Sequence, residues 1–364
     1  MRRGILWTLV LIFLFLPILS CAAGRFTVFT EKSVPSDLGF RVNSFSGEVT
    51  MTFLGDCTFG GEEKSRTNYE GFVRVVERNG MDFPMRNLSA LTLQDDISVI
   101  NLEGVLTDRE LDKVEKKYNF SGSTAYTEIL NIAGIECVNL ANNHSHDYGD
   151  EGYRDTREAL EKAGVSWFGE EEMAVWENPE GMLIGFVGVF YSLNGKREAA
   201  FTKRMKILRD LGCSAIVAVM HTGDEYKSAI NGYQEQIARW AVKNGADLVI
   251  GHHPHVVQGL QVIRGVPVVY SLGNCSFGGA IRPRDYDALA VQAVMRFEDS
   301  EHVETELRLY PIRVSSVKDV NNFCPVFLKG ANAQRVMEKM RKSTGYLPVF
   351  LEEEGFAREV YPAP

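Results

Sequence analysis

Three histidines lie within four residues of one another, at His252, His253 and His255, directly after the apolar run Asp247–Ile250. The run is typical of a buried strand, and the loop that follows can direct at least two imidazoles to one point, as a metal site requires. Six of the seven histidines of the chain fall in three short segments, and only His302 stands apart. An isolated histidine is more often a core residue than a ligand, but this clustering favours metal chemistry.

Other polar side chains follow other apolar runs, each at the carboxyl end of an expected strand. These positions are Asp56, Asn101, Glu103, Asn142, Asn143, His144, Asp147, His221, Glu225 and Asn274. Ligands of open α/β sheets bind at this edge, because the loops converge over the strand ends. A single Asp or Asn there could equally form a turn, so the prediction depends on the whole set. Oxygen and imidazole donors suit a divalent metal of the Mn, Fe or Zn kind, and their number is enough for two ions.

The elements that must position these residues alternate between strands and helices. We expect strands over 49–54, 97–100, 135–140, 182–190, 215–220, 247–250, 259–263 and 266–272, with helices over 72–80, 125–133, 153–163, 196–211 and around 237–241 and 336–340. This rhythm predicts an α/β fold. Two longer apolar runs over 289–297 and 303–312, joined by an acidic turn, predict an antiparallel edge or a second sheet.

The N-terminus has the composition of an export signal: two arginines, an apolar stretch and a small-residue end, over residues 1–20. The segment Ile18-Leu19-Ser20-Cys21 resembles a bacterial lipobox, in which Cys21 is acylated and becomes the first residue of the cleaved chain. Plain cleavage near Ala22 and an uncleaved anchor are the alternatives. We therefore expect a cell-envelope lipoprotein, anchored outside the cytoplasm, with a lipid-anchored tether over 21–46, one domain over 47–345 and a loose C-terminal tail over 346–364.

Composition excludes several classes of protein. With 45% hydrophobic and 24% charged residues in 364, the chain is typical of a globular protein. Loss of residues 1–20 removes two arginines and no acid, so the net charge of −9 becomes −11. This acidity argues against a nucleic-acid partner, which needs basic surface. The five cysteines after Cys21 are scattered, which predicts buried thiols instead of disulfides.

Taken together, the motifs resemble the poly-γ-glutamate capsule biosynthesis (CapA) family, a branch of the calcineurin-like metallophosphoesterases. The motifs are Gly55-Asp56, Asn101-Leu102-Glu103-Gly104, Lys117-Tyr118-Asn119-Phe120, Leu140-Ala141-Asn142-Asn143-His144, Asp147-Tyr148-Gly149, the run from His221 to Tyr226, the run from Gly251 to Gln258, and Tyr270-Ser271-Leu272-Gly273-Asn274. The resemblance implies a four-layer α/β/β/α sandwich of the metallophosphoesterase type with a two-metal site.

The resemblance also implies roles. The metal positions would be Asp56, Glu103, Asn143, His221, His253 and His255, with His144 as the catalytic general acid and Asn101, Asn142, Asp147, Glu225, His252 and Asn274 in support. The chain departs from the wider pattern at Thr58, where a histidine is usual, which predicts weaker binding or loss of one metal. Thr222 and Cys275 depart at positions expected to affect substrate contacts.

The implied function is capsule or poly-γ-glutamate biosynthesis, by a metal-dependent hydrolase or transferase acting on an anionic γ-glutamyl polymer or peptide at the cell envelope. Lys227, Arg282 and Arg284 would offset charge repulsion, or serve only as solvated surface charges. Two alternatives stay open: a non-catalytic component that holds or exports the polymer beside a membrane synthase, and a phosphoesterase or nucleotidase.

Overall fold

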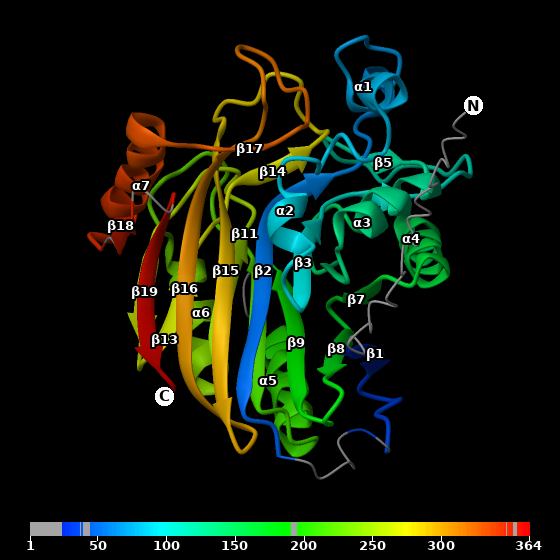
Figure 1. The fold of residues 1–364 in the computed structure, drawn as a ribbon. Coiled ribbons are helices and arrows are strands. Elements are labelled where there is room, and N and C mark those ends of the chain that lie inside the picture. The colour runs from blue at the N-terminus through cyan, green and yellow to red at the C-terminus, as the bar shows by residue number, and fades with distance from the viewer. Residues whose placement is uncertain (1–23, 37, 39–43, 191–194, 347, 352–354) are drawn as a thin grey trace, which may run out of the picture.

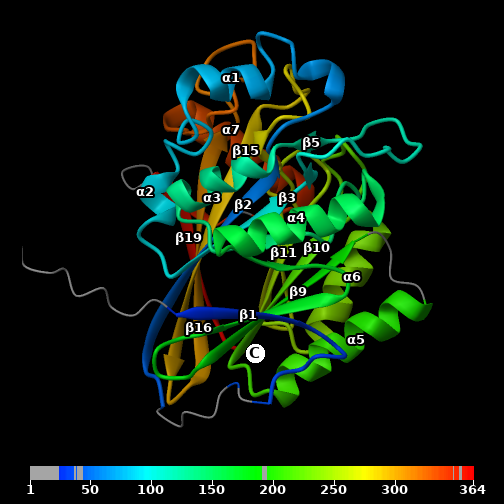
Figure 2. The same ribbon diagram turned by 90° about the vertical axis from the view of Figure 1, so that its right-hand side faces the viewer.

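Two large β-sheets lie face to face in this protein, and helices cover the outer face of each (Figures 1 and 2). The computed structural model describes residues 24–36, 38, 44–190, 195–346, 348–351 and 355–364. The predicted four-layer α/β/β/α sandwich is confirmed.

The first sheet has seven strands, four of which are mutually parallel. In spatial order they are β1 (Arg25–Thr30), β8 (Glu172–Glu177), β9 (Leu183–Phe190), β10 (Ala215–His221), β11 (Leu248–His252), β13 (Val266–Val269) and β12 (Leu260–Ile263). The helices α5 (Gly195–Asp210) and α6 (Gly232–Lys243) pack on its outer face. α6 begins at a capping box, in which the Asn231 side chain accepts from the backbone of Gln234 at 3.1 Å.

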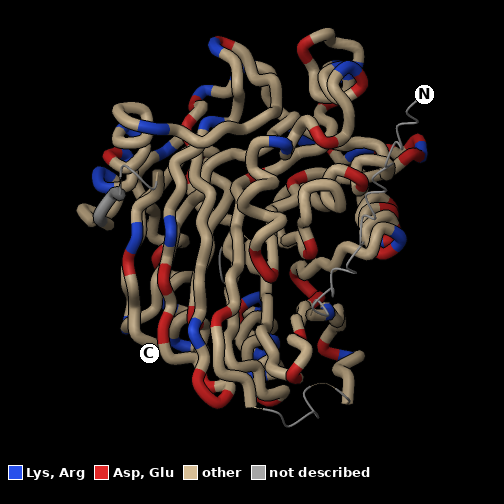
Figure 3. The backbone as a smooth tube through the Cα atoms, in the orientation of Figure 1, with Lys and Arg blue, Asp and Glu red and all other residues tan. Residues whose placement is uncertain are grey.

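The second sheet has ten strands, which include one long hairpin and the two strands nearest the C-terminus. Its main order is β18 (Val349–Leu351), β19 (Phe356–Pro362), β16 (Glu301–Arg313), β15 (Asp287–Glu298), β2 (Gly47–Thr58), β3 (Ile97–Leu102), β6 (Cys137–Asn139) and β7 (Ser166–Phe168), with β14 (Asn274–Phe277) beside β2 and β17 (Val326–Phe327) beside β16. β15 and β16 form the expected antiparallel pair, and Figure 3 shows the acidic residues of their turn at the lower end.

Helices and short elements complete the outer layer of this sheet. They are η1 (Glu63–Ser65), α1 (Phe72–Asn79), α2 (Ser89–Thr92), η2 (Thr124–Tyr126), α3 (Thr127–Ala133) and α4 (Gly149–Ala163), with a separate two-stranded pair of β4 (Val105–Leu106) and β5 (Ser121–Gly122). α7 (Gly330–Thr344) adds its buried face to the core between the sheets.

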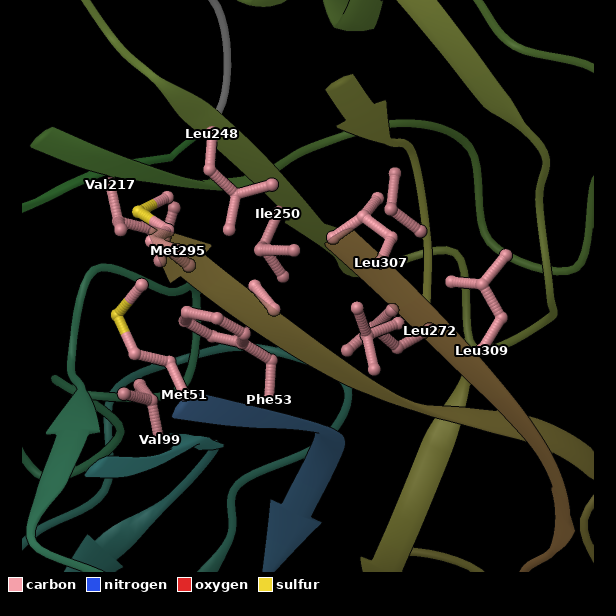
Figure 4. Close-up of a cluster of buried hydrophobic side chains, with 14 of the residues drawn as sticks. Met51, Phe53, Val99, Val217, Leu248, Ile250, Leu272, Met295, Leu307 and Leu309 are labelled. Carbon is pink, nitrogen blue, oxygen red and sulfur yellow. The ribbon is translucent and has the colours of Figure 1, made fainter. Parts of the chain in front are cut away.

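The core between the two sheets anchors the strands that lead to the site. Met51 and Phe53 of β2 meet Leu248 and Ile250 of β11 there (Figure 4). Leu54 of the same strand instead joins the core under the outer helices. Complete burial stabilises each of these side chains by about 1.5 to 3 kcal/mol. β2 is therefore packed on both faces. This packing holds Asp56, two residues after Leu54, in a fixed position.

The structure differs from the predictions for both ends of the chain. Arg25–Thr30, expected in a tether, pairs with β8, and Arg25 forms a 2.7 Å ion pair with Glu177. Phe356–Pro362, expected in a loose tail, pairs with β16. β1 pairs with a strand far away in the sequence, and β19 pairs with the distant β16 as well as with the neighbouring β18, so no local period predicts the long-range pairings. Pro362 is tolerated because it lies at the end of its strand.

Residues 1–20 and Cys21 lie outside the described residues, so the signal peptide and the lipidation stay predictions. Among the described helices, none combines the length and the apolar character needed to span a bilayer. The five other cysteines are buried and free, as predicted; they are Cys57, Cys137, Cys213, Cys275 and Cys324.

Candidate metal centre

The carboxyl ends of strands from both sheets meet at one edge of the sandwich. In the second sheet, Asp56 pairs in register with Asn101 on one side and Asn274 on the other. In the first sheet, His221 pairs in register with His252. β2 and β14 end side by side near the top of Figure 1. Residues separated by most of the chain are thus brought into one cluster.

Asp56 lies at the centre of this cluster and is fully buried. Its carboxylate accepts from Asn101 Nδ2 at 2.8 Å, and its Oδ2 lies 3.1 Å from His255 Nδ1. His252 Nδ1 lies 3.2 Å from Oδ1. Burial pushes the pKa of Asp56 upward, but its contacts with His252 and His255 outweigh that effect and hold the pKa well below its usual range. Asp56 is therefore an anion in the site.

Glu103 is the most exceptional group in the cluster. Its side chain is fully buried, and neither carboxylate oxygen has a hydrogen-bond partner among the described residues. Three imidazoles face Oε1 through Nε2, at 3.7 Å for His221, 3.8 Å for His144 and 3.9 Å for His255. Burial raises the pKa of Glu103 well above its usual value, and the negative charge of Asp56 adds to this.

These separations fit a cation between the side chains. A hydrogen bond requires less than about 3.2 Å, whereas ligands each about 2.0 to 2.2 Å from one ion lie about 3 to 4 Å apart. Two ligand sets have their donor atoms within 4.8 Å of one another: Glu103, His221 and His253, and Asp56, Glu103 and His255. Glu103 belongs to both sets, so it can bridge two ions. The orphaned carboxylate and the donor chemistry therefore suit a divalent metal.

The histidines differ in how the site affects their charge. Burial lowers the pKa of His221 well below its usual value, and that of His253 falls to about 4 for the same reason, with His255 adding to it. Burial also disfavours the His255 cation, but Glu103 and Asp56 outweigh this and raise its pKa to about 9. Neutral His221 and His253 have the form that a metal ligand needs.

The loop that presents the histidines is held in an uncommon conformation. His253 has φ of 98° and His255 has φ of 55°, both in the region that side chains other than glycine rarely adopt. Such positions cost on the order of 1 to 3 kcal/mol each and persist where the surroundings enforce them. The His253 amide faces Asp56 Oδ2 at 3.3 Å, and Asn274 Oδ1 lies 2.9 Å from His255 Nδ1.

Asn143 and its neighbours connect the cluster to the next loop. Asn143 Oδ1 lies 2.6 Å from His221 Nε2, which in turn lies 3.2 Å from His253 Nδ1. Asn142 donates to Asn101 Oδ1 at 3.2 Å, so it supports the site from below. Of the metal, catalytic and supporting residues predicted from the sequence, Glu225 alone is exposed. The other members of the set are gathered around Asp56 and Glu103.

His144 is held by Asp147, which the sequence analysis predicted in a supporting role, and by Lys116, which it missed. Its Nδ1 lies 2.7 Å from Asp147 Oδ2, and the Lys116 ammonium contacts the other oxygen of Asp147 and lies 3.2 Å from His144 Nδ1. Phe120 stacks on the imidazole with ring centroids 4.3 Å apart. Burial lowers the pKa of His144, while Asp147 opposes this. Lys116 escaped notice because it stands in a run of charged residues typical of an exposed loop.

A second missed residue and a noted departure both form hydrogen bonds to residues of the site. Asn139 Nδ2 donates to Asn101 Oδ1 at 2.8 Å, and the position of Asn139 inside an apolar strand was the available signal. Thr58, at the position where a histidine is usual, donates its hydroxyl to the carbonyl of Glu103 at 2.7 Å. Thr58 therefore fixes the loop that carries Glu103.

Comparison with known proteins agrees with this arrangement. The family model described as bacterial capsule synthesis protein PGA_cap matches residues 50–278. The chain is 29% identical over 264 residues to capsule biosynthesis protein CapA of Bacillus anthracis, covering 65% of this chain and 62% of that relative, less than two thirds of its length. It is 27% identical over 268 residues to PGA biosynthesis protein CapA of Bacillus subtilis (strain 168), covering 67% of this chain and 68% of the relative.

A third relative comes from another group of bacteria. It is named probable polyglutamine synthesis accessory protein, from Mycobacterium tuberculosis, and is 25% identical over 280 residues, covering 62% of this chain and 73% of the relative. The resemblance found in the sequence motifs is thereby confirmed.

Proposed function

Because this chain belongs to the bacterial capsule synthesis protein family PGA_cap, we propose that it is a metal-dependent hydrolase or transferase acting on an anionic γ-glutamyl polymer or peptide. The observation that supports catalysis is the Glu103 carboxylate, buried without a hydrogen bond and faced by three imidazoles. A protein that only held a polymer would gain nothing from so costly a group. The relatives named for capsule and PGA biosynthesis support the substrate class.

Asp56, Glu103, Asn143, His221, His253 and His255 would hold the metal, as one ion or two. When bound, a divalent metal supplies Lewis acidity that polarises a carbonyl or phosphoryl oxygen. Asp56 remains anionic at neutral pH, so it provides a fixed negative ligand. His221 and His253 remain neutral and offer lone pairs.

His144 would exchange a proton with the substrate at Nε2. Because the Asp147 carboxylate accepts at the 2.7 Å contact with Nδ1, the proton of a neutral His144 would lie on Nδ1 and leave Nε2 free toward the cluster. Lys116 neutralises Asp147, and Phe120 fixes the plane of the ring. This is the arrangement expected of a general acid or base whose orientation is set by a carboxylate.

We place the protein at the cell envelope within the same proposal. The support is the export signal over residues 1–20 and the lipobox that ends at Cys21. A lipid anchor there would hold the domain at the membrane beside a polymer synthase.

The test combines metal analysis with one substitution. The full chain is expected to purify with a divalent metal, and His253→Ala should lower the metal content and abolish γ-glutamyl cleavage or transfer, followed by mass spectrometry. His146→Ala is the matched control, because His146 is half exposed and lies outside both ligand sets. If wild type carries no metal and polymer production in cells survives His253→Ala, catalysis is excluded. Phosphate release from an aryl phosphate without γ-glutamyl cleavage would identify a phosphoesterase.

A further inference from the structure

An aromatic ring joins the metal cluster to a cation at one side of the mouth. The Tyr226 ring lies 5.8 Å from the His255 ring, and the Arg284 guanidinium lies 4.7 Å above Tyr226. Tyr226 is fixed in turn, since its amide donates to the Pro254 carbonyl at 2.8 Å. A guanidinium laid flat on a ring keeps its N–H groups directed outward in the ring plane, where a carboxylate can meet them.

A second stack rises from the other side of the cluster. Phe120 packs on His144, Tyr118 stacks on Phe120 with centroids 6.5 Å apart, and Lys117 Nζ lies 4.8 Å from the Tyr118 ring. Arg284 comes from the loop after β14 and Lys117 from the loop between β4 and β5. The two cations therefore lie on separate loops. Tyr226 lies between Arg284 and His255, and Tyr118 and Phe120 lie between Lys117 and His144.

Neither cation forms an ion pair with another residue of the described part of the chain. Neighbouring cations are paired: Arg282 with Glu70 at 2.9 Å, and Lys113 with Glu63 at 3.3 Å. By contrast, within the part of the chain that is described, no carboxylate lies within 4.0 Å of Lys117 or Arg284. Lys117 also lines a cavity of about 200 Å³, together with Lys64, Lys113 and Lys116 and with the carboxylates of Glu62 and Glu63. In a chain of net charge −9, these two unpaired cations beside the site are groups able to attract an anion.

We propose that Lys117 and Arg284 bind free carboxylates of the anionic substrate on the two sides of the reacting bond. Lys117 holds the part of the substrate next to His144, and Arg284 the part next to His255. The inference rests on the proposed function for its substrate class, a polycarboxylate. Cation stacking alone would be insufficient, because Arg78 also lies 3.9 Å above the Tyr69 ring. The distinction is that the stacks of Lys117 and Arg284 each stand on a histidine of the metal cluster.

The experiment measures binding of short oligoglutamates to the full chain in detergent, with a chelator present so that no turnover occurs. The probes are a γ-linked oligomer, an α-linked oligomer and the γ-linked oligomer with its free carboxylates converted to amides. The variants are Lys117→Gln, Arg284→Gln and the double variant. Arg282→Gln, Lys113→Gln and Arg78→Gln are matched controls, since they remove a paired or a remote cation.

Each single substitution should weaken binding of a carboxylate oligomer about tenfold, as expected for one charge-assisted contact, and the double variant about a hundredfold. The controls should change it less than about twofold. The amidated oligomer should bind wild type and variants equally weakly. If Lys117→Gln and Arg284→Gln bind as the controls do, the inference is overturned.

The result is distinguishable from failure of the proposed function. Dependence on Lys117 and Arg284 with the α-linked oligomer but no binding of the γ-linked one would keep the carboxylate site and remove the γ-glutamyl substrate. Polymer production that survives His253→Ala would remove the catalysis, while the binding measurement, made without metal, would still decide the carboxylate site.

Discussion

Replacing Glu103 by glutamine should stabilise the metal-free protein and at the same time remove its response to metal. Glutamine has the shape of glutamate but no charge. In the metal-free protein the wild-type site must either bury the Glu103 charge or keep the group protonated, and both cost free energy. We expect Glu103→Gln to raise the free energy of unfolding, measured with a chelator, by about 1 to 3 kcal/mol.

The change can be converted to a melting temperature. An unfolding entropy of about 2 cal/mol/K per residue makes 1 kcal/mol correspond to about 1.4 °C for a chain of this length, so the expected rise in melting temperature is about 1.4 to 4 °C. A ligand at 100 times its Kd stabilises by about 2.7 kcal/mol, so wild type should gain about 4 °C with metal and the variant about 1 °C or less.

Differential scanning calorimetry with chelator and with added Mn²⁺ or Zn²⁺ measures both effects. Glu172→Gln is the contrast, because Glu172 is equally buried but paired with Arg157 at 2.7 Å and Tyr153 at 2.9 Å. Its loss should destabilise by about 1 to 3 kcal/mol in both conditions. If Glu103→Gln melts below wild type in chelator, or keeps the full response to metal, the reasoning about this carboxylate is wrong.

Three further outcomes are expected. Burial raises the pKa of Asp95 to about 7, so the contribution of Asp95 to the stability of the wild type should be lost as the pH rises from about 4 to about 7. In urea unfolding, the free energy of unfolding of Asp95→Asn should exceed that of the wild type by about 1 to 2 kcal/mol at pH 8. The two values should be about equal near pH 4. Lys116→Gln should slow turnover about tenfold or more with metal content unchanged, because His144 loses its fixed orientation; equal turnover would contradict that role. Cys21→Ser should abolish lipid labelling and release the protein from membranes. If the N-terminal peptide of the wild-type protein carries no added lipid mass, the anchor is ruled out.

Much of the site could be predicted because its chemistry stands at strand ends. Asp56, Glu103 and His221 each follow an apolar run, and the rule that loops converge at that edge was enough to bring them together. The sequence could not show that Glu103 would be left without a hydrogen bond. That depends on the packing of three loops from both sheets, and no local pattern encodes it.

The missed elements share one physical cause. β1 and β19 are short and find their partners in β8 and β16, far away along the chain, so neither has a local period strong enough to stand out. Lys116 was similarly hidden, because a lysine in a charged loop is ordinarily solvated. Only the fold of the loop between β4 and β5 turns its side chain onto Asp147.

The division of ligands between the two sheets has a mechanical consequence. Asp56 and Glu103 belong to one layer, and His221, His253 and His255 to the other. A bound ion would hold the two layers together at this rim, and its removal would leave the Glu103 carboxylate there with no partner among the described residues. Amide hydrogens of the loops there should then exchange faster without metal, while those of the central strands, clamped by the apolar interlayer, keep their protection.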